Sequence, residues 1–354
     1  MIDANLNRSS EGLRVLEDVA RFLLNDAELS QRLRTLRHDL AQETKSLTLG
    51  LLSGRDVEHD VGHPRSKDSE PITKAAPLQR LLDLVVANAK RVEEALRVME
   101  EVAKLPEMNS LLNSAGFEQT RFALYTLERD LFSKISRRDK TDRMAGLYVI
   151  LDRQFLASRD ELEVARQIIE GGARAIQLRD KQSKKRELLV VAQKLKELCG
   201  QAGVLFIVND HLDLAITVDA DGLHIGQEDL PLTLVRRQLP IDKIVGCSVT
   251  TASQATVAQN EGADYIAVGS VFPTTTKKEA IVVGVDTVRE LKRTISTPLV
   301  AVGGMNQSNI GEVVAAGADA VAVVSAVLGE KDVKGAVQKL VTKIDLAREK
   351  CQTQ

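Results

Sequence analysis

Charged residues recur where short β-branched runs end in the C-terminal part of the chain. Two carboxylates, Asp210 and Asp229, follow consecutive runs, and the cations Arg179, Lys181 and Lys277 follow others. Two carboxylate oxygens, with phosphate oxygens and waters, can hold Mg²⁺, which keeps most of its hydration shell. Cations beside such a site stabilise charge on a leaving group, so the set predicts magnesium-dependent departure of pyrophosphate. For each aspartate alone, a helix cap or a turn is the alternative.

A second anion site is indicated farther along the chain. Gly303-Gly304 and Val324-Ser325 follow the last two runs. In a barrel, loops at these positions bind phosphate through backbone N–H groups. The hydroxyls of Thr274 through Thr276 would donate to the same or a neighbouring group, although a glycine pair alone is equally typical of a tight turn. Two phosphate sites in one mouth would imply two phosphorylated reactants.

Uncharged polar residues in the same region could bind a polar ring. Gln177, Asn209 and Ser248 offer hydrogen bonds, although a buried carboxamide is as often satisfied by a neighbouring strand. His224 faces inward by alternation and is expected to orient a hydrogen bond, since no second histidine lies at metal-ligand spacing. Cys247 is expected to be a small core residue.

These residues must be positioned by a fold that brings many strand ends together. From Gly146 onward, β-branched runs alternate with segments of helical period, which is typical of βα units around a parallel sheet. The predicted strands are residues 146–152, 175–180, 205–210, 222–227, 244–249, 265–272, 298–304 and 320–327. Eight units predict a (β/α)8 barrel for residues 144–354, with the active site at the C-terminal strand ends. A doubly wound open sheet is the alternative, but no G-x-G-x-x-G follows the first strand.

Residues 1–143 have apolar positions at helical spacing and are predicted to be mostly helical. A charged stretch with glycines and prolines at 53–77 predicts a long loop. Residues 4–20 align without gaps to 87–103, displaced by 83 positions, with ten of seventeen pairs identical. Residues 36–40 are echoed in 127–131, so the predicted unit is a helical hairpin that occurs twice.

Polar residues are repeated as well as apolar ones. Asn, Arg, Glu, Arg and Glu recur at every third position, as Asn5, Arg8, Glu11, Arg14, Glu17 and as Asn88, Arg91, Glu94, Arg97, Glu100. One interpretation is a solvated or inter-helix ladder of salt bridges. The other is that the copies face each other across a pseudo-twofold axis and line a cleft with arginines for an anionic ligand. A repeat kept only for packing would need only its apolar face.

The amino-acid composition of the chain argues against some kinds of binding partner. The net charge is −2 and aromatic residues are 3% of the chain with no Trp, which argues against nucleic-acid and anionic-membrane binding. The three cysteines form no C-x-x-C pair, and no apolar run reaches the ~18 residues of a membrane span. We therefore expect a cytosolic, cytoplasmic protein that acts on small phosphorylated molecules. The apolar helix faces of the repeat leave room for a homo-oligomer.

Six motifs, taken together, resemble the thiamine-phosphate synthases. In order and strand position they are Tyr148–Asp152, Gln177–Lys181, Asn209-Asp210, Gly222–Asp229, Phe272–Lys277 and Gly303–Met305. The resemblance implies that 4-amino-5-hydroxymethyl-2-methylpyrimidine diphosphate and thiazole phosphate, or its carboxylated form, give thiamine phosphate and pyrophosphate. It also implies a dissociative path, in which diphosphate leaves, a pyrimidine methylene cation forms and the thiazole nitrogen attacks.

The resemblance assigns a role to each site residue. The pyrimidine diphosphate would contact Gln177, Leu178, Arg179, Asp180, Lys181, Asn209, Ser248 and Lys277. The thiazole phosphate would contact Thr274, Thr275, Thr276, Gly304, Val324 and Ser325. Mg²⁺ would bind to Asp210 and Asp229, and Arg179, Lys181, Lys277 and Ser248 would be catalytic. The alternatives are a thiazole tautomerase, which need not keep the diphosphate residues, and a catalytically silent scaffold that binds thiamine phosphate.

The helical region resembles a domain that is fused ahead of some thiamine-phosphate synthases and linked to hydroxymethylpyrimidine phosphate kinase activity. The resemblance lies in the doubled polar pattern and in the loop Gly54–Gly62. No G-x-x-x-x-G-K-[ST] loop is present, so an ATP site would be built in another way. A kinase, a ligand-sensing regulatory domain and a dimerisation module are three hypotheses for this region.

Overall fold

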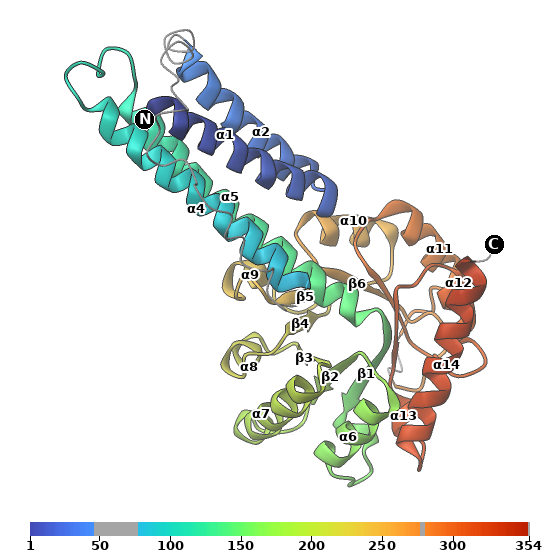
Figure 1. Cartoon of the computed structure of the whole chain (residues 1–354). Helices are drawn as coiled ribbons and strands as arrows, with labels where there is room; N and C mark the ends of the chain where they lie inside the picture. The colour runs from blue at the N-terminus through green and yellow to red at the C-terminus, as the bar shows by residue number, and fades with distance from the viewer. Residues whose placement is uncertain (46–76, 277–279, 353–354) are drawn as a thin grey trace, which may run out of the picture. The chain divides into compact units, whose positions relative to one another are not determined.

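The computed structural model describes residues 1–45, 77–276 and 280–352 (Figure 1). The chain divides into two compact units, Met1–Ser136 and Arg137–Gln354. The predicted loop at 53–77 lies outside the described residues, except that Pro77 begins a helix. Within the described ranges, no helix is long and apolar enough to cross a membrane.

Parallel strands close into a barrel in the second unit, each paired with the next in sequence order and β8 with β1. The strands are β1 (Gly146–Asp152), β2 (Ala175–Arg179), β3 (Leu205–Asn209), β4 (Gly222–Ile225), β5 (Ile244–Val249), β6 (Tyr265–Val268), β7 (Leu299–Val302) and β8 (Ala320–Val323). Helices surround them in Figure 1. The predicted (β/α)8 barrel is confirmed, and the open sheet is excluded because β1 pairs with β8.

The outer layer consists of helices that follow the strands. They are α6 (Glu161–Gly171), α7 (Lys185–Ala202), α8 (Leu212–Thr217), α9 (Leu232–Gln238), α10 (Ala252–Asn260), α11 (Val285–Thr294), α12 (Ile310–Ala315), α13 (Ser325–Leu328) and α14 (Val333–Gln352), with a short 3-10 turn, η3 (Arg153–Phe155), after β1. A large apolar core fills the space between these helices and the strands.

The predicted strands at 265–272 and 320–327 are too long. β6 ends at Val268, and β8 ends at Val323 because Ser325 begins α13. A run of small and β-branched residues has the same composition in a buried strand and in a short buried helix after it. Ser325 therefore lies at the start of a helix and not on the strand.

A second, smaller core fills the inside of the barrel. Tyr148 on β1 and Tyr265 on β6 are its largest residues, and both are buried. Small neighbours make room for them, because a Cβ on Gly246 of β5 would clash with the ring of Tyr265. The packing at Gly246 thus fixes where the Tyr265 hydroxyl lies.

The first unit contains the repeat. Its elements are α1 (Ile2–Asp18), the π-helical segment η1 (Val19–Leu23), α2 (Ala27–Glu43), α4 (Pro77–Ala103) and the larger part of α5 (Ser114–Met144). The aligned copies lie on α1–η1 and on α4, and the shorter echoes lie on α2 and α5. Leu13 of the first copy and its equivalent Leu96 are both fully buried in one core.

Two glutamates at equivalent positions of the repeat hold each helix to its neighbour. Glu17 accepts hydrogen bonds from Arg34 and Arg37 on α2, and Glu100 accepts one from Arg121 on α5 at 3.1 Å. Burial alone would raise the pKa of Glu17, but the hydrogen bonds and charges of the two arginines lower it. At this end of the repeat the salt-bridge interpretation is confirmed.

Replacing Gly246 by alanine tests the inner core. We expect Gly246→Ala to lower the free energy of unfolding of the barrel by about 1–3 kcal/mol, since overpacking forces neighbours from their preferred positions. Gly200→Ala on α7 is the matched control, because a Cβ there meets nothing within 4 Å. Urea titration followed by circular dichroism would measure both. A Gly246→Ala barrel as stable as the control would contradict the packing described.

Candidate active site

One cavity of about 460 Å³ lies at the C-terminal ends of the barrel strands. Most of the site residues predicted from the sequence line this cavity. The predicted residues that line it are Gln177, Arg179, Lys181, Asn209, Asp210, Asp229, Ser248, Thr274, Thr276, Gly304, Val324 and Ser325. Residues far apart in the sequence thus meet in a single space, as the ends of parallel strands in a barrel require.

Three predicted residues lie elsewhere. Leu178 is buried in the core between strands and helices, because successive strand residues point to opposite faces. Asp180 accepts hydrogen bonds from the backbone of Gln182 and Ser183, and so stabilises the turn after β2. Thr275 is exposed and does not line the cavity. The side chains of these three residues do not line the cavity, and their contacts with the substrates stay a prediction. Lys277 lies outside the described residues.

The two predicted metal ligands lie against each other. Burial raises the pKa of Asp210, and the neighbouring carboxylate of Asp229 raises it further, whereas Lys181 and Arg179 lower it. Asp210 has a left-handed backbone, φ 61°, which for a residue other than glycine is uncommon and often found at functional sites. The Asp229 carboxylate is fixed by the backbone N–H of Gly226 at 2.6 Å. The backbone at Asp210 and the N–H group of Gly226 therefore hold the two carboxylates close together although they repel each other.

This donor set fits a magnesium ion. Two mutually repelling carboxylates are hard oxygen ligands, and a divalent cation removes their repulsion. Lys181 Nζ lies 3.6 Å from Asp210 Oδ2, while Arg179 forms an ion pair with Asp152. Among the described residues no cluster of three or more His, Cys, Asp or Glu could form an all-protein metal cage. Phosphate oxygens and waters would complete the coordination.

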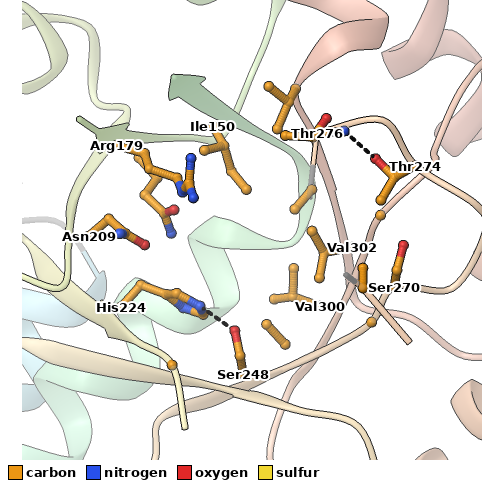
Figure 2. A pocket seen from close by; sticks show the side chains of 18 of the residues that line it. Ile150, Arg179, Asn209, His224, Ser248, Ser270, Thr274, Thr276, Val300 and Val302 are labelled. Carbon is orange, nitrogen blue, oxygen red and sulfur yellow. Dashed lines mark hydrogen bonds between the residues drawn. The ribbon is translucent and has the colours of Figure 1, made fainter. Parts of the chain in front are cut away.

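A chain of hydrogen bonds crosses the inside of the barrel. Gln177 Nε2 donates to the Tyr148 hydroxyl at 2.8 Å, which lies 3.1 Å from the Tyr265 hydroxyl. That hydroxyl is 3.1 Å from Nδ1 of His224, whose Nε2 lies 2.9 Å from Ser248 Oγ (Figure 2). If each group donates to the next, every member is satisfied and the Ser248 hydrogen is left for a ligand. The prediction that His224 orients a hydrogen bond is consistent with these contacts.

Burial keeps this chain neutral. It lowers the pKa of His224 to about 4, although the charge of Asp229 opposes the shift. It also raises the pKa of Tyr148 and of Tyr265. Sequence reasoning missed both tyrosines, although their inward positions on β1 and β6 could have been found by alternation. Cys247 is buried in the outer core, as predicted.

Among the described residues, the opposite side of the cavity carries hydroxyl and backbone groups and no charged side chain. Figure 2 shows Thr274, Thr276 and Ser270 there, with Val300 and Val302 between them and the histidine. Ser270, which sequence reasoning missed, donates to the backbone oxygen of Phe272 at 2.6 Å.

The glycine pair after β7 is required by its backbone. Gly303 has φ 98° and Gly304 has φ 67°, and a Cβ on Gly304 would lie 2.5 Å from the backbone oxygen of Pro273. Val324 and Ser325, at the start of α13, line the same part of the cavity. Loops after the seventh and eighth strands of such barrels frequently bind phosphate.

Two family models match the chain. The model described as thiamine monophosphate synthase matches residues 147–327, and the model described as the ThiD2 family matches residues 1–130. The two matches fall on the barrel and on the helical region.

Named relatives match almost the whole chain. A thiamine-phosphate synthase of Thermosynechococcus vestitus is 37% identical, over 97% of this chain and 94% of its own length. A thiamine-phosphate synthase of Synechocystis sp. is 38% identical, over 97% of this chain and 95% of its own length. Among solved structures, a thiamine phosphate pyrophosphorylase from Pyrococcus furiosus is similar with a TM-score of 0.55 and 38% identity, covering 58% of this chain and 98% of that one.

The buried neutral His224 predicts a pH dependence of stability. Its pKa is about 4 in the folded barrel and about 6.5 in an unfolded chain, so the unfolded chain binds more protons between these values. We expect the wild-type barrel to lose stability as pH falls from about 6.5 to 4 more steeply than the His224→Gln variant. Urea titrations of both proteins across this range, without metal, would measure the difference. Parallel pH profiles would show that His224 is not held neutral.

Proposed function

The chain belongs to the thiamine-phosphate synthase family, and we propose that its reaction takes place in the cavity at the C-terminal ends of the barrel strands. The protein is a transferase of thiamine biosynthesis. It joins 4-amino-5-hydroxymethyl-2-methylpyrimidine diphosphate to thiazole phosphate and releases thiamine phosphate and pyrophosphate; with the carboxylated form, carbon dioxide is lost as well. The observation that supports this proposal is that the described lining of the cavity divides into a side with charged residues and a side with hydroxyl and backbone groups.

The pyrimidine diphosphate would occupy the charged side. Arg179 and Lys181 would bind its phosphates, and the resemblance adds Lys277. Gln177, Asn209 and Ser248 would hydrogen-bond the pyrimidine ring, with the Ser248 hydroxyl oriented by His224. Asp210 and Asp229 would hold Mg²⁺, which when bound supplies charge neutralisation to the diphosphate.

In the bond-breaking step, the bond between the pyrimidine methylene carbon and the diphosphate oxygen would break, and its electron pair would leave on the oxygen. Arg179 and Lys181 stabilise that charge, since cations placed at a leaving group lower the barrier. The remaining methylene carbon is cationic. Neutral His224 and the neutral tyrosines below it put no positive charge beside it, whereas a protonated imidazole would repel it.

The thiazole phosphate would occupy the uncharged side. Backbone groups at Gly304, Val324 and Ser325 and the hydroxyls of Thr274 and Thr276 would bind its phosphate. The thiazole ring nitrogen would then donate its electron pair to the methylene carbon, forming the new carbon–nitrogen bond. The site binds and orients both reactants, and the nucleophile belongs to the substrate.

For the helical unit we propose hydroxymethylpyrimidine phosphate kinase activity, which would make the diphosphate that the barrel consumes. The support is the match of residues 1–130 to the ThiD2 family and the extension of the relatives' similarity over nearly the whole chain. A regulatory domain and a dimerisation module that makes a homo-oligomer are the other hypotheses. A kinase consumes ATP, a regulatory domain shifts barrel kinetics when a ligand is added, and a dimerisation module does neither.

Replacing Asp210 tests the metal assignment. We expect Asp210→Asn to lower kcat for magnesium-dependent thiamine phosphate formation by about 100-fold or more, because it removes one charged ligand. Asparagine tolerates the left-handed backbone, so the fold should be retained. Asp213→Ala, an exposed carboxylate paired with Lys185 on a nearby helix, is the control and should keep normal turnover. Near-normal turnover of Asp210→Asn would show that the metal is held elsewhere.

Two parallel reactions separate the hypotheses for the whole chain. Both reactions contain the full-length protein, Mg²⁺ and thiazole phosphate. One also receives pyrimidine monophosphate and ATP, the other receives pyrimidine diphosphate without ATP, and thiamine phosphate is measured in each. We expect product in both reactions, from a fused kinase and synthase. Product from the diphosphate alone would refute the kinase proposal, and product from neither would favour a tautomerase or a silent scaffold.

A further inference from the structure

A second pocket lies against helices α1 and α4 of the helical unit, and its charged lining residues are exposed. Its volume is about 660 Å³, within the ~300–1,000 Å³ typical of small-molecule sites. Its polar lining consists of Asn5, Arg8, Lys90, Arg91 and Glu94. Three cations therefore face one carboxylate in a cavity that the barrel reaction does not use.

The cavity is built from both copies of the repeat. Arg8 and Arg91 occupy equivalent positions, displaced by 83 residues, and both line it. Helices α1 and α4 approach each other closely beside these arginines. At Gly12 there is no room for a side chain, since a Cβ would lie 2.5 Å from Val92 Cγ2 and 3.1 Å from the backbone oxygen of Asn88. A small residue at the crossing thus brings two equivalent arginines to one space.

These arginines differ from the others of the repeat in their partners. Arg14 pairs with Asp18 at 3.6 Å, and Arg97 pairs with Glu100 at 3.0 Å. Arg8 and Lys90, in contrast, form no ion pair with any residue that the structure describes. In the described part of the protein, Glu94 alone among the lining residues opposes the three cations, so the positive charge of the pocket is only partly balanced.

Buried asparagines occupy equivalent positions in the two copies, and one of them contacts an arginine of the pocket. Asn88 donates to the backbone oxygen of Leu84 at 2.8 Å, and its side-chain oxygen accepts from Arg91 at 3.3 Å. Its equivalent, Asn5, donates to the backbone oxygen of Met1 at 3.0 Å. Burying a carboxamide on a helix costs free energy unless its groups are paired, so two such residues at equivalent positions indicate a common task.

We propose that this cavity binds a small phosphorylated molecule, with Arg8 and Arg91 holding the phosphate from the two copies of the repeat. The planar guanidinium group forms paired hydrogen bonds with phosphate oxygens, and Lys90 adds a third cation. Small apolar residues of α4, Ala87 and Ala95, leave space for the organic part. The proposal concerns binding and holds whether or not the helical unit is a kinase.

The test uses inorganic pyrophosphate and isothermal titration of the full chain. An Arg179→Ala background weakens the barrel site, so the binding that remains reports on the helical cavity. We expect one equivalent to bind in this background, and at least tenfold weaker binding when Arg8→Ala and Arg91→Ala are added. Added Arg14→Ala and Arg97→Ala, the equivalent pair outside the cavity, should leave the affinity unchanged.

A separate measurement guards against misfolding. With intact Arg179, the Arg8→Ala/Arg91→Ala variant should form thiamine phosphate from supplied pyrimidine diphosphate at the normal rate, since neither residue lines the barrel cavity. No pyrophosphate binding in the Arg179→Ala background, or equal binding with and without the two cavity arginines, would overturn the proposal. Neither result would bear on the barrel reaction, which the turnover assay measures independently.

Discussion

The contact between Asp210 and Asp229 is the constraint on which the rest of the barrel site depends. Two carboxylates held together at a partly buried position repel each other, and the raised pKa of Asp210 expresses that cost. The chain maintains the contact with local means, a left-handed residue at Asp210 and the Gly226 N–H at Asp229. Under the proposed function, a divalent cation bound there would remove this repulsion and attract a diphosphate. The nearby Lys181 would then face the same phosphate groups.

Charged side chains lie at the mouth of the barrel, and neutral polar side chains lie deeper inside it. The mouth carries carboxylates and cations, whereas the chain of hydrogen bonds below it is neutral because burial disfavours every charged form of its members. This separation suits a reaction in which positive charge develops on carbon. Cations stabilise the negative charge on the leaving group, whereas a cation beside the carbon centre would repel its positive charge. A buried network can supply orientation without charge, which is what a Ser248 hydroxyl held by a neutral His224 provides.

The sequence could predict the barrel and most of its cavity because both follow from local rules. Strand alternation places Gln177 and Arg179 inward, and strand ends converge in any closed parallel barrel. The same alternation turns the side chain of Leu178 into the outer core, and its predicted contact with the pyrimidine diphosphate rests on the motif alone. Alternation places Tyr148 and Tyr265 inward one at a time, but it does not predict that they contact each other, since they are separated by 117 positions and meet only when the barrel closes. The ends of β6 and β8 were misplaced because composition does not distinguish a buried strand from the short turn or helix after it.

The helical repeat shows how one pattern can serve two purposes along a single helix. Its two interpretations, a salt-bridge ladder and an arginine-lined cleft, apply to different ends of each copy. Where α2 and α5 supply arginines, Glu17 and Glu100 are buried and paired. Nearer the start of each copy, Arg8 meets the other copy, which brings two cations, Lys90 and Arg91, and one carboxylate, Glu94, to the same pocket. Two copies that pack on each other thus bring the equivalent residues Arg8 and Arg91 to one pocket. Under the proposal above, an anionic ligand would neutralise the positive charge that Glu94 does not balance.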